Sequence, residues 1–217
     1  MSAIGPWPNF FIVGAMRGGT TALYEYLAQH PEVFLPRVKE PHFFSQARDR
    51  FSESVHEEAS YLALFAGATR GAVGEASASY LWSVEAPRRI RARIPGARII
   101  ILLRDPVERA HSHYLWEVRN GTESRPFYQA LTEDHASPAK EWGDAHLYVD
   151  LGLYCAQVER YLKLFGADQV LLLLSRHLEG DPAMALRSVC RFLGIDGRPA
   201  ETFGSAERHN PYGAPRS

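Results

Sequence analysis

Runs of apolar residues with almost no polar interruption constrain the fold of this chain more than any other feature. They are FFIVG at 10–14, RIIILL at 98–103 and QVLLLL at 169–174. A strand with one face in water alternates apolar and polar residues. A continuous apolar run of this length is typical of a parallel strand that helices cover on both faces. A weaker run, GAVGEAS at 71–77, is the candidate for a fourth strand of the same buried sheet.

Helical patterns separate these runs. The candidate helices are 20–29, 57–66, 106–119, 153–165 and 182–193. Asp105 is a plausible N-cap before Pro106, and Gly166 and Gly194 are plausible C-caps. This alternation of strands and helices predicts an α/β fold. Its form is a P-loop-type three-layer sandwich with a mostly parallel central sheet flanked by helices.

Composition and charge narrow the classes of function. A chain of 217 residues with 46% hydrophobic residues can build one domain with a sizeable core. The formal net charge of -1 argues against wholesale nucleic-acid binding. No apolar run approaches the ~18 residues that span a bilayer, and we recognise no signal peptide. The two cysteines, Cys155 and Cys190, suit a reducing compartment. We therefore expect a cytoplasmic protein with neither a membrane nor a nucleic-acid partner.

The turn after the first apolar run, GAMRGGTT at 14–21, predicts an anion-binding site. A strand that passes through a glycine-rich turn into a helix points several backbone N–H groups and the helix dipole at one place, where phosphate or sulfate binds. Gly18 and Gly19 permit tight turning. Thr20 and Thr21 add hydroxyl groups, and Arg17 adds a permanent cation.

This turn differs at one position from the turn of P-loop nucleotide hydrolases. In that class a lysine contacts the terminal phosphates beside a Mg²⁺ ion held by an acidic residue. Here Thr20 stands in the place of that lysine. The strand at 98–103 is followed by Arg104, a cation that suits a second phosphate better than a metal ion. The alternative that stays open is a P-loop nucleotide-binding protein or small-molecule kinase that uses ATP and Mg²⁺.

Several segments, taken in order, resemble one family, the sulfotransferases that use 3′-phosphoadenosine 5′-phosphosulfate (PAPS). The likeness is greatest to the heparan-sulfate-type branch and its bacterial relatives. The turn at 14–21 is similar to the family's 5′-phosphosulfate loop, and RDPVERAHSHY at 104–114 to its 3′-phosphate motif. KEPHFF at 39–44 resembles the segment that carries its catalytic glutamate, and GEASASYL at 74–81 its second active-site strand. The likeness covers nearly the whole chain, so it implies a single sulfotransferase domain over 1–217.

The resemblance implies transfer of a sulfuryl group from PAPS to a hydroxyl or amine of a carbohydrate or other small-molecule acceptor. The product nucleotide is 3′-phosphoadenosine 5′-phosphate (PAP), and no metal is required. The residues implied to hold the 5′-phosphosulfate are Arg17, Gly18, Gly19, Thr20 and Thr21. Those implied at the 3′-phosphate are Arg104 and Ser112, with Gly213 and Arg216 in the tail motif NPYGAPRS. The family usually continues with a further helix, so truncation after Ser217 is left open, as is the oligomeric state.

The resemblance also assigns catalytic roles. Glu40 is implied to be the general base, and His42 is the rival base because other sulfotransferase branches use a histidine. Arg17 stands where the family usually has lysine. Arginine keeps the charge that stabilises the leaving nucleotide, but it does not give up a proton. Heparan-type members often carry a second lysine where this chain has Ala76, so heparan specificity is not carried over.

The acceptor is the least determined part of the prediction. Lys39 is expected to contact the acceptor or the sulfonate, and Ser77 or Ser79 to contact the acceptor. The long loops 36–54 and 135–150 are expected to line the acceptor site. Within the second loop, Trp142 and Tyr148 are candidates to stack on a sugar or aromatic ring. These residues do not choose between carbohydrate, phenol, lipid and antibiotic scaffolds, or between O- and N-sulfation.

Overall fold

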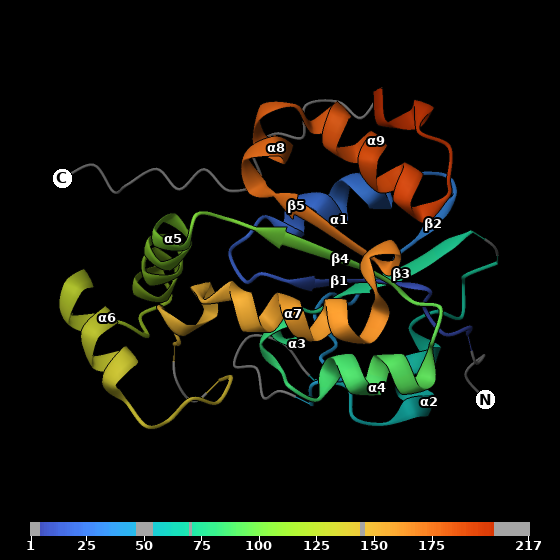
Figure 1. The fold of residues 1–217 in the computed structure, drawn as a ribbon. Helices are drawn as coiled ribbons and strands as arrows, with labels where there is room; N and C mark the ends of the chain where they lie inside the picture. Colours follow the sequence, from blue (N-terminus) through green and yellow to red (C-terminus); the bar gives the residue numbers. More distant parts are fainter. Residues whose placement is uncertain (1–4, 47–53, 70, 144–145, 202–217) are drawn as a thin grey trace.

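A computed structural model of the chain describes residues 5–46, 54–69, 71–143 and 146–201. The described residues contain five strands, which form one sheet in the order β2–β3–β1–β4–β5 (Figure 1). Each neighbouring pair is parallel. In chain order the strands are β1 (Phe10–Gly14), β2 (Val33–Phe34), β3 (Ala72–Ala76), β4 (Arg98–Leu103) and β5 (Val170–Leu174). The predicted α/β fold with a parallel central sheet is confirmed.

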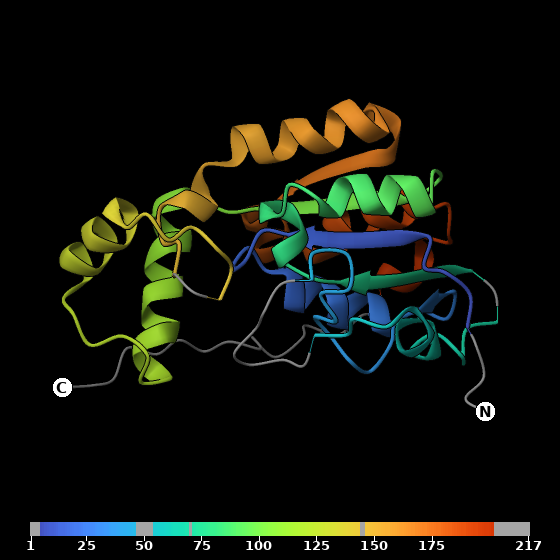
Figure 2. The same cartoon turned by 90° about the horizontal axis from the view of Figure 1, so that it is seen from below.

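Helices cover both faces of the sheet (Figures 1 and 2). One layer contains α1 (Thr20–Ala28), α8 (Ser175–Gly180) and α9 (Pro182–Leu193). The opposite layer contains α2 (Glu58–Ala63), α3 (Ser79–Trp82), α4 (Ala86–Arg93) and α7 (Tyr154–Phe165). Successive side chains of a strand point to opposite faces. Phe10 and Ile12 therefore enter the core between the sheet and the layer of α1 and α9. Phe11 and Val13 enter the core between the sheet and the opposite helix layer. This explains why the strands read as unbroken apolar runs.

Two further helices, α5 (Pro106–Arg119) and α6 (Phe127–Ala136), lie beyond the carboxyl end of β4 (Figure 1). α5 starts where the sequence predicts, because Asp105 Oδ1 accepts the N–H groups of Val107 and Glu108 at 2.9 and 3.0 Å. A short 3₁₀ turn, η1 (Asp150–Gly152), leads into α7. Ligands of open α/β sheets bind at this edge of the sheet, so α5 is one wall of the expected site.

The elements missing from the sequence prediction are short or polar. They are β2, α3, α4, α6 and α8. A strand of two residues or a helix of four is too short to show a hydrophobic period. The predicted helix at 57–66 is confirmed in shortened form as α2, and the described part of 36–54 contains neither helix nor strand, as predicted.

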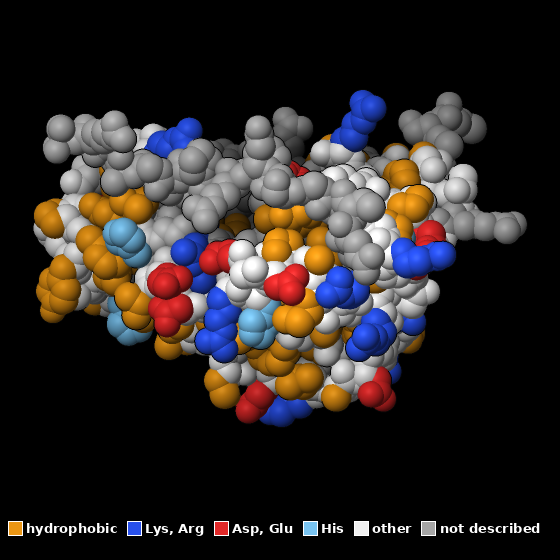
Figure 3. Space-filling view, turned by 90° about the horizontal axis from the view of Figure 1, so that it is seen from above, with side chains coloured by type: hydrophobic (Ala, Val, Ile, Leu, Met, Phe, Trp, Pro, Cys, Tyr) orange, Lys and Arg blue, Asp and Glu red, His pale blue; other side chains and the backbone are white. Residues whose placement is uncertain are grey.

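The surface carries charges of both signs. Figure 3 shows basic and acidic side chains interspersed on the face that α8 and α9 cover. Within the described ranges, no helix combines the length and the apolar composition that crossing a bilayer requires.

Candidate active site

The glycine-rich turn leaves β1 at the centre of the sheet and packs against the ends of two neighbouring strands. The N–H of Ala15 donates to the carbonyl of Leu102 at 2.7 Å. Ser175 Oγ, at the end of β5, donates to the carbonyl of Gly18 at 2.6 Å. A Cβ on Gly18 would lie 2.7 Å from the carbonyl oxygen of Leu102, so a side chain has no room there. The turn is therefore fixed by backbone contacts that require glycine.

The first turn of α1 is open to a ligand. Its N-cap is Gly19, with φ 96°, and no described side chain caps the helix. The first turn contains no acidic residue; Thr20 in it is buried and Thr21 is exposed. The first N–H groups of a helix have no partner within the helix, and they form its positive end. This end of α1 therefore fits an anion.

The two predicted phosphate-binding segments meet in space. Arg17, in the turn before α1, donates from both Nε and Nη2 to Ser112 Oγ, each over 3.2 Å. Ser112 lies about two turns into α5, and 95 residues separate the pair. The structure thus brings the turn after β1 and the helix after β4 to one place, as the sequence predicts.

Arg104 leaves the carboxyl end of β4 beside the same helix. Its Nε lies 3.3 Å from Glu108 Oε2, and its side chain is 29% exposed against 63% for Glu108. Such an exposed pair contributes little to stability. Its guanidinium is therefore available to a phosphate that competes with the carboxylate of Glu108.

A second cation, Arg109, is buried under this site. It lies three residues before Ser112 on α5, and its Nη2 donates to the carbonyl of Tyr148. Its Nε and Nη1 have no hydrogen-bond partner within the described residues. Burial lowers the pKa of Arg109 to about 10, and the positive charge of Arg17 acts in the same direction. A buried guanidinium with unsatisfied donors makes the pocket positive, which fits an anionic ligand.

Glu40 lies at the carboxyl end of β3, next to the glycine-rich turn. Its N–H donates to the carbonyl of Ala76 at 3.0 Å, and its Oε2 accepts the N–H of Ala78 at 2.7 Å. Its Oε1 accepts from Lys39 Nζ at 2.7 Å, and 21% of its side chain is exposed. A Cβ on Gly14 would lie 3.3 Å from the carbonyl oxygen of Ala78, so Ala78 joins Glu40 to the turn that carries Arg17.

His42 is placed behind Glu40. It is fully buried, its Nδ1 lies 2.6 Å from Ser79 Oγ, and its Nε2 lies 3.9 Å from Glu40 Oε2. The ring centroid of Trp142 is 6.2 Å from that of His42. Of the two candidate bases, Glu40 is therefore the one that solvent partly reaches, while the imidazole of His42 lies behind it in the interior.

The comparisons with known proteins decide the family. A family model described as "Sulfotransferase domain" matches residues 8–209.

This chain belongs to the sulfotransferase family.

Relatives and solved structures agree with that assignment. Human heparan sulfate glucosamine 3-O-sulfotransferase 6 is 34% identical over 190 residues, which cover 87% of this chain and 53% of the relative. A crystal structure of a sulfotransferase from Alicyclobacillus acidocaldarius is 38% identical, with a TM-score of 0.82 over 88% of this chain and 83% of that one. Mouse sulfotransferase SULT7A1 complexed with PAP shares the fold at 17% identity, with a TM-score of 0.61 over 90% and 62%. The chain spans 22% of the length of mouse bifunctional heparan sulfate N-deacetylase/N-sulfotransferase 4 and 53% of the length of the human 3-O-sulfotransferase.

Two expectations about the acceptor side of this sulfotransferase are wrong. Tyr148 cannot stack on an acceptor, because it is fully buried with its ring 5.0 Å from those of His113 and His146. Ser77 and Ser79 are also buried, and they contact the backbone and the ring of His42 instead. Both errors concern burial, which depends on the elements packed around a residue.

Other parts of the sulfotransferase site were missed or lie elsewhere. Ser175 had no predicted role, and Arg109, although it lies within the predicted 3′-phosphate motif 104–114, was given no role of its own. The signal for Ser175 is its place directly after a predicted strand. The signal for Arg109 is its spacing of three from Ser112, which puts both on one helix face. Gly213 and Arg216 lie outside the described residues. Among the residues described, no group of three or more His, Cys, Asp and Glu side chains is arranged to hold a metal ion.

Proposed function

We propose that the chain, as one catalytic domain over 1–217, transfers a sulfuryl group from PAPS to a hydroxyl or amine of a small-molecule or carbohydrate acceptor. The observation that supports this most is the contact of Arg17 with Ser112. It joins the open first turn of α1 to the helix after β4 in a chain of the sulfotransferase family. The SULT7A1 structure complexed with PAP and the carbohydrate acceptors in the names of the heparan sulfate relatives support the donor and the acceptor class.

The proposed nucleotide site has two anion-binding subsites. The turn from Arg17 to Thr21 holds the 5′-phosphosulfate through backbone N–H groups and the Arg17 guanidinium. Arg104 and Ser112 hold the 3′-phosphate. The buried charge of Arg109 raises the positive potential near the two subsites. Each hydrogen bond from a charged donor to an anion contributes about 1.5–3 kcal/mol.

The proposed chemistry needs a base on the acceptor side and a cation on the leaving side. Glu40 takes the proton of the attacking hydroxyl or amine as its bond to sulfur forms. Arg17 stays protonated and balances the charge left on the phosphate oxygen when the sulfur–oxygen bond breaks. Ala78 and Lys39 hold the two oxygens of Glu40 in place. The protein thus contributes alignment and charge stabilisation, as it does in phosphoryl transfer.

The acceptor is proposed only as a class. Trp142, beside His42, is in place to line its site. The heparan-type lysine is replaced by Ala76 at the end of β3, which disfavours a copy of heparan specificity. Cys155 and Cys190 are both free thiols, so we propose a reducing compartment, the cytoplasm, as the setting.

Glu40→Gln tests the proposed base. The amide keeps the shape of the side chain but cannot take a proton, so turnover with PAPS should fall at least about 100-fold. PAP affinity, measured by calorimetry, should stay the same. Glu57→Gln, an exposed glutamate at the start of α2, is the matched control and should keep wild-type turnover. Full turnover of Glu40→Gln would show that Glu40 is not the base.

A further inference from the structure

A fully buried carboxyl group, that of Glu75, lies in the sheet directly below the proposed active site. Glu75 is in β3, in register with Phe11 of β1. Its Oε1 accepts hydrogen bonds from the hydroxyls of Tyr61 at 2.8 Å and Tyr80 at 2.7 Å, and its Oε2 accepts from Ser77 Oγ at 2.9 Å. Burial raises the pKa of Glu75 to about 7, although the three hydroxyls act in the opposite direction. Burial of a carboxyl group is unfavourable, and the proposed chemistry gives Glu75 no role that would explain it.

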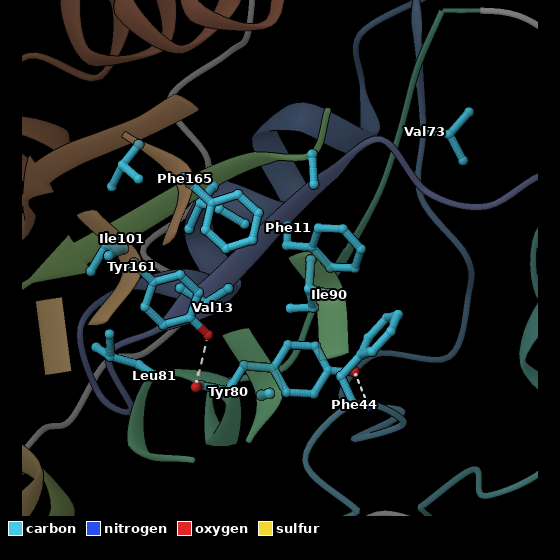
Figure 4. Close-up of a cluster of buried hydrophobic side chains, with 14 of the residues drawn as sticks. Phe11, Val13, Phe44, Val73, Tyr80, Leu81, Ile90, Ile101, Tyr161 and Phe165 are labelled. Carbon is cyan, nitrogen blue, oxygen red and sulfur yellow. Dashed lines mark hydrogen bonds between the residues drawn. The ribbon is translucent and has the colours of Figure 1, made fainter. Parts of the chain in front are cut away.

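Two of the three hydroxyls also hold backbone N–H groups of the segment that carries Glu40. The N–H of His42 donates to Ser77 Oγ, and the N–H of Phe44 donates to the Tyr80 hydroxyl, both at 3.1 Å. Figure 4 shows the second of these bonds, with Tyr80 between Phe44 and Tyr161. A hydroxyl has one proton. Because each hydroxyl gives its proton to Glu75, its lone pairs are turned toward the amide.

The segment held in this way has a strained backbone. Glu40 has φ 60°, His42 has φ 52° and Gln46 has φ 52°, all in the left-handed region that non-glycine residues rarely adopt. Each such residue persists only where its surroundings impose it. The hydroxyls of Ser77 and Tyr80 accept hydrogen bonds from the amides of His42 and Phe44, and they donate to different oxygens of the Glu75 carboxyl group. Glu75 is thus the common anchor of both contacts.

We propose that Glu75 is a positioning residue, which orients the hydroxyls of Ser77 and Tyr80 so that they fix the turn of residues 40–46 and aim Glu40 at the acceptor. Its effect on turnover rests on the proposed function. Its effect on the backbone of the segment does not, because that effect follows from the hydrogen bonds alone.

The chain offers a matched pair of variants. Tyr61 and Tyr80 are both fully buried, and both donate to Glu75 Oε1. Within the described residues, the Tyr80 hydroxyl also holds an amide of the segment, and the Tyr61 hydroxyl holds none. Tyr61→Phe and Tyr80→Phe therefore remove the same group from the same carboxyl group, and only the second releases the backbone that presents Glu40.

The kinetic test compares these variants with wild type. Tyr80→Phe, Ser77→Ala and Glu75→Gln should each lower kcat about 10- to 100-fold, the scale of a misplaced catalytic group. Their PAP affinity should stay within about twofold, since the two proposed anion-binding subsites lie in the turn after β1 and at Arg104 and Ser112 after β4. Tyr61→Phe should keep the wild-type kcat. Equal losses in Tyr61→Phe and Tyr80→Phe would overturn the proposal, because they would assign the effect to general loss of packing.

Hydrogen exchange tests the same proposal without any need for activity. In Tyr80→Phe and Glu75→Gln, the amides of residues 40–46 should exchange at least about tenfold faster, while those of β1 stay protected. Tyr61→Phe should leave residues 40–46 as protected as in wild type. Unchanged protection in Tyr80→Phe would overturn the role of Glu75, whatever the turnover. Absence of PAPS turnover in wild type would end the proposed function instead, and the exchange result would still decide the role of Glu75. If Glu75→Gln does not fold, the tyrosine pair decides alone.

Discussion

Two neighbouring strands, β1 and β4, each lead through a turn into a helix, and the two helices begin differently. α1 begins after Gly19 with no described side-chain cap. α5 begins at Asp105, whose carboxylate accepts the N–H groups of Val107 and Glu108. The first passage leaves its helix N-terminus to a ligand. In the second passage, Asp105 already caps the helix N-terminus, and the groups left for a ligand are the side chains of Arg104 and Ser112.

This difference teaches that a helix N-terminus at a sheet edge is not by itself an anion site. What matters is whether the chain has supplied a capping carboxylate of its own. In the proposed site, the uncapped passage receives the group at the reaction centre through its backbone. The capped passage receives the distal phosphate through its side chains.

The largest effect is expected at the uncapped passage. Arg17→Ala removes the cation there and both hydrogen bonds to Ser112. PAP affinity should fall about 10- to 100-fold, the equivalent of about one charge-assisted bond. Calorimetry measures this, and Arg88→Ala on α4, whose side chain is 64% exposed, is the control for loss of a charge. Equal affinity of Arg17→Ala and wild type would place the phosphosulfate elsewhere.

A smaller loss is expected at the capped passage. Arg104 contributes a single, partly exposed guanidinium that already contacts Glu108. Arg104→Ala should weaken PAP binding about tenfold. Adenosine 5′-phosphate, which lacks the 3′-phosphate, should bind the variant and wild type alike. If Arg104→Ala weakens both nucleotides equally, Arg104 does not recognise the 3′-phosphate.

The cap itself should matter for stability and not for binding. Asp105→Ala leaves two N–H groups of α5 without a cap, so the free energy of unfolding should fall by about 1 kcal/mol and Tm by roughly 2–4 °C. Asp181→Ala is the matched control, because Asp181 caps α9 through the N–H of Met184 at 2.9 Å and has no role in the proposed site. Both variants should keep PAP affinity. Loss of PAP binding in Asp105→Ala alone would mean that the cap belongs to the nucleotide site.

The smallest effect should be a gain. Glu108 competes for Arg104 and carries the same sign of charge as the ligand. Glu108→Gln should therefore raise PAP affinity about two- to threefold at low salt, and the gain should shrink as salt screens the exposed carboxylate. Titrations at two ionic strengths would measure it. A loss of affinity would show that Glu108 helps the ligand to bind.

The sequence predicts the central sheet well because helices cover it on both faces. β1, β4 and β5 are apolar at almost every position, so no packing information is needed to find them. α3 and β2 could not be found in this way, since elements of four and two residues show no period. Their existence depends on the neighbours they pack against.

In the candidate site, too, the local motifs could be predicted from the sequence, and the packing between distant elements could not. Arg17, Ser112 and Glu40 stand out in motifs; the structure places Arg17 and Glu40 at the ends of β1 and β3 and brings Ser112 of α5 against Arg17. The burial of Tyr148 and Ser79 could not be predicted, because it comes from elements that are distant in the chain. The hydroxyls around Glu75 come from α2, α3 and the end of β3, and no local pattern places them together.

Calorimetry of the wild-type chain with PAP, and with ATP in the presence of Mg²⁺, tests the central claim most directly. We predict that PAP binds at one site per chain, with no need for Mg²⁺, and that Arg17→Ala greatly weakens this binding. Binding of ATP only with Mg²⁺, together with no binding of PAP, would contradict the claim and favour the kinase alternative.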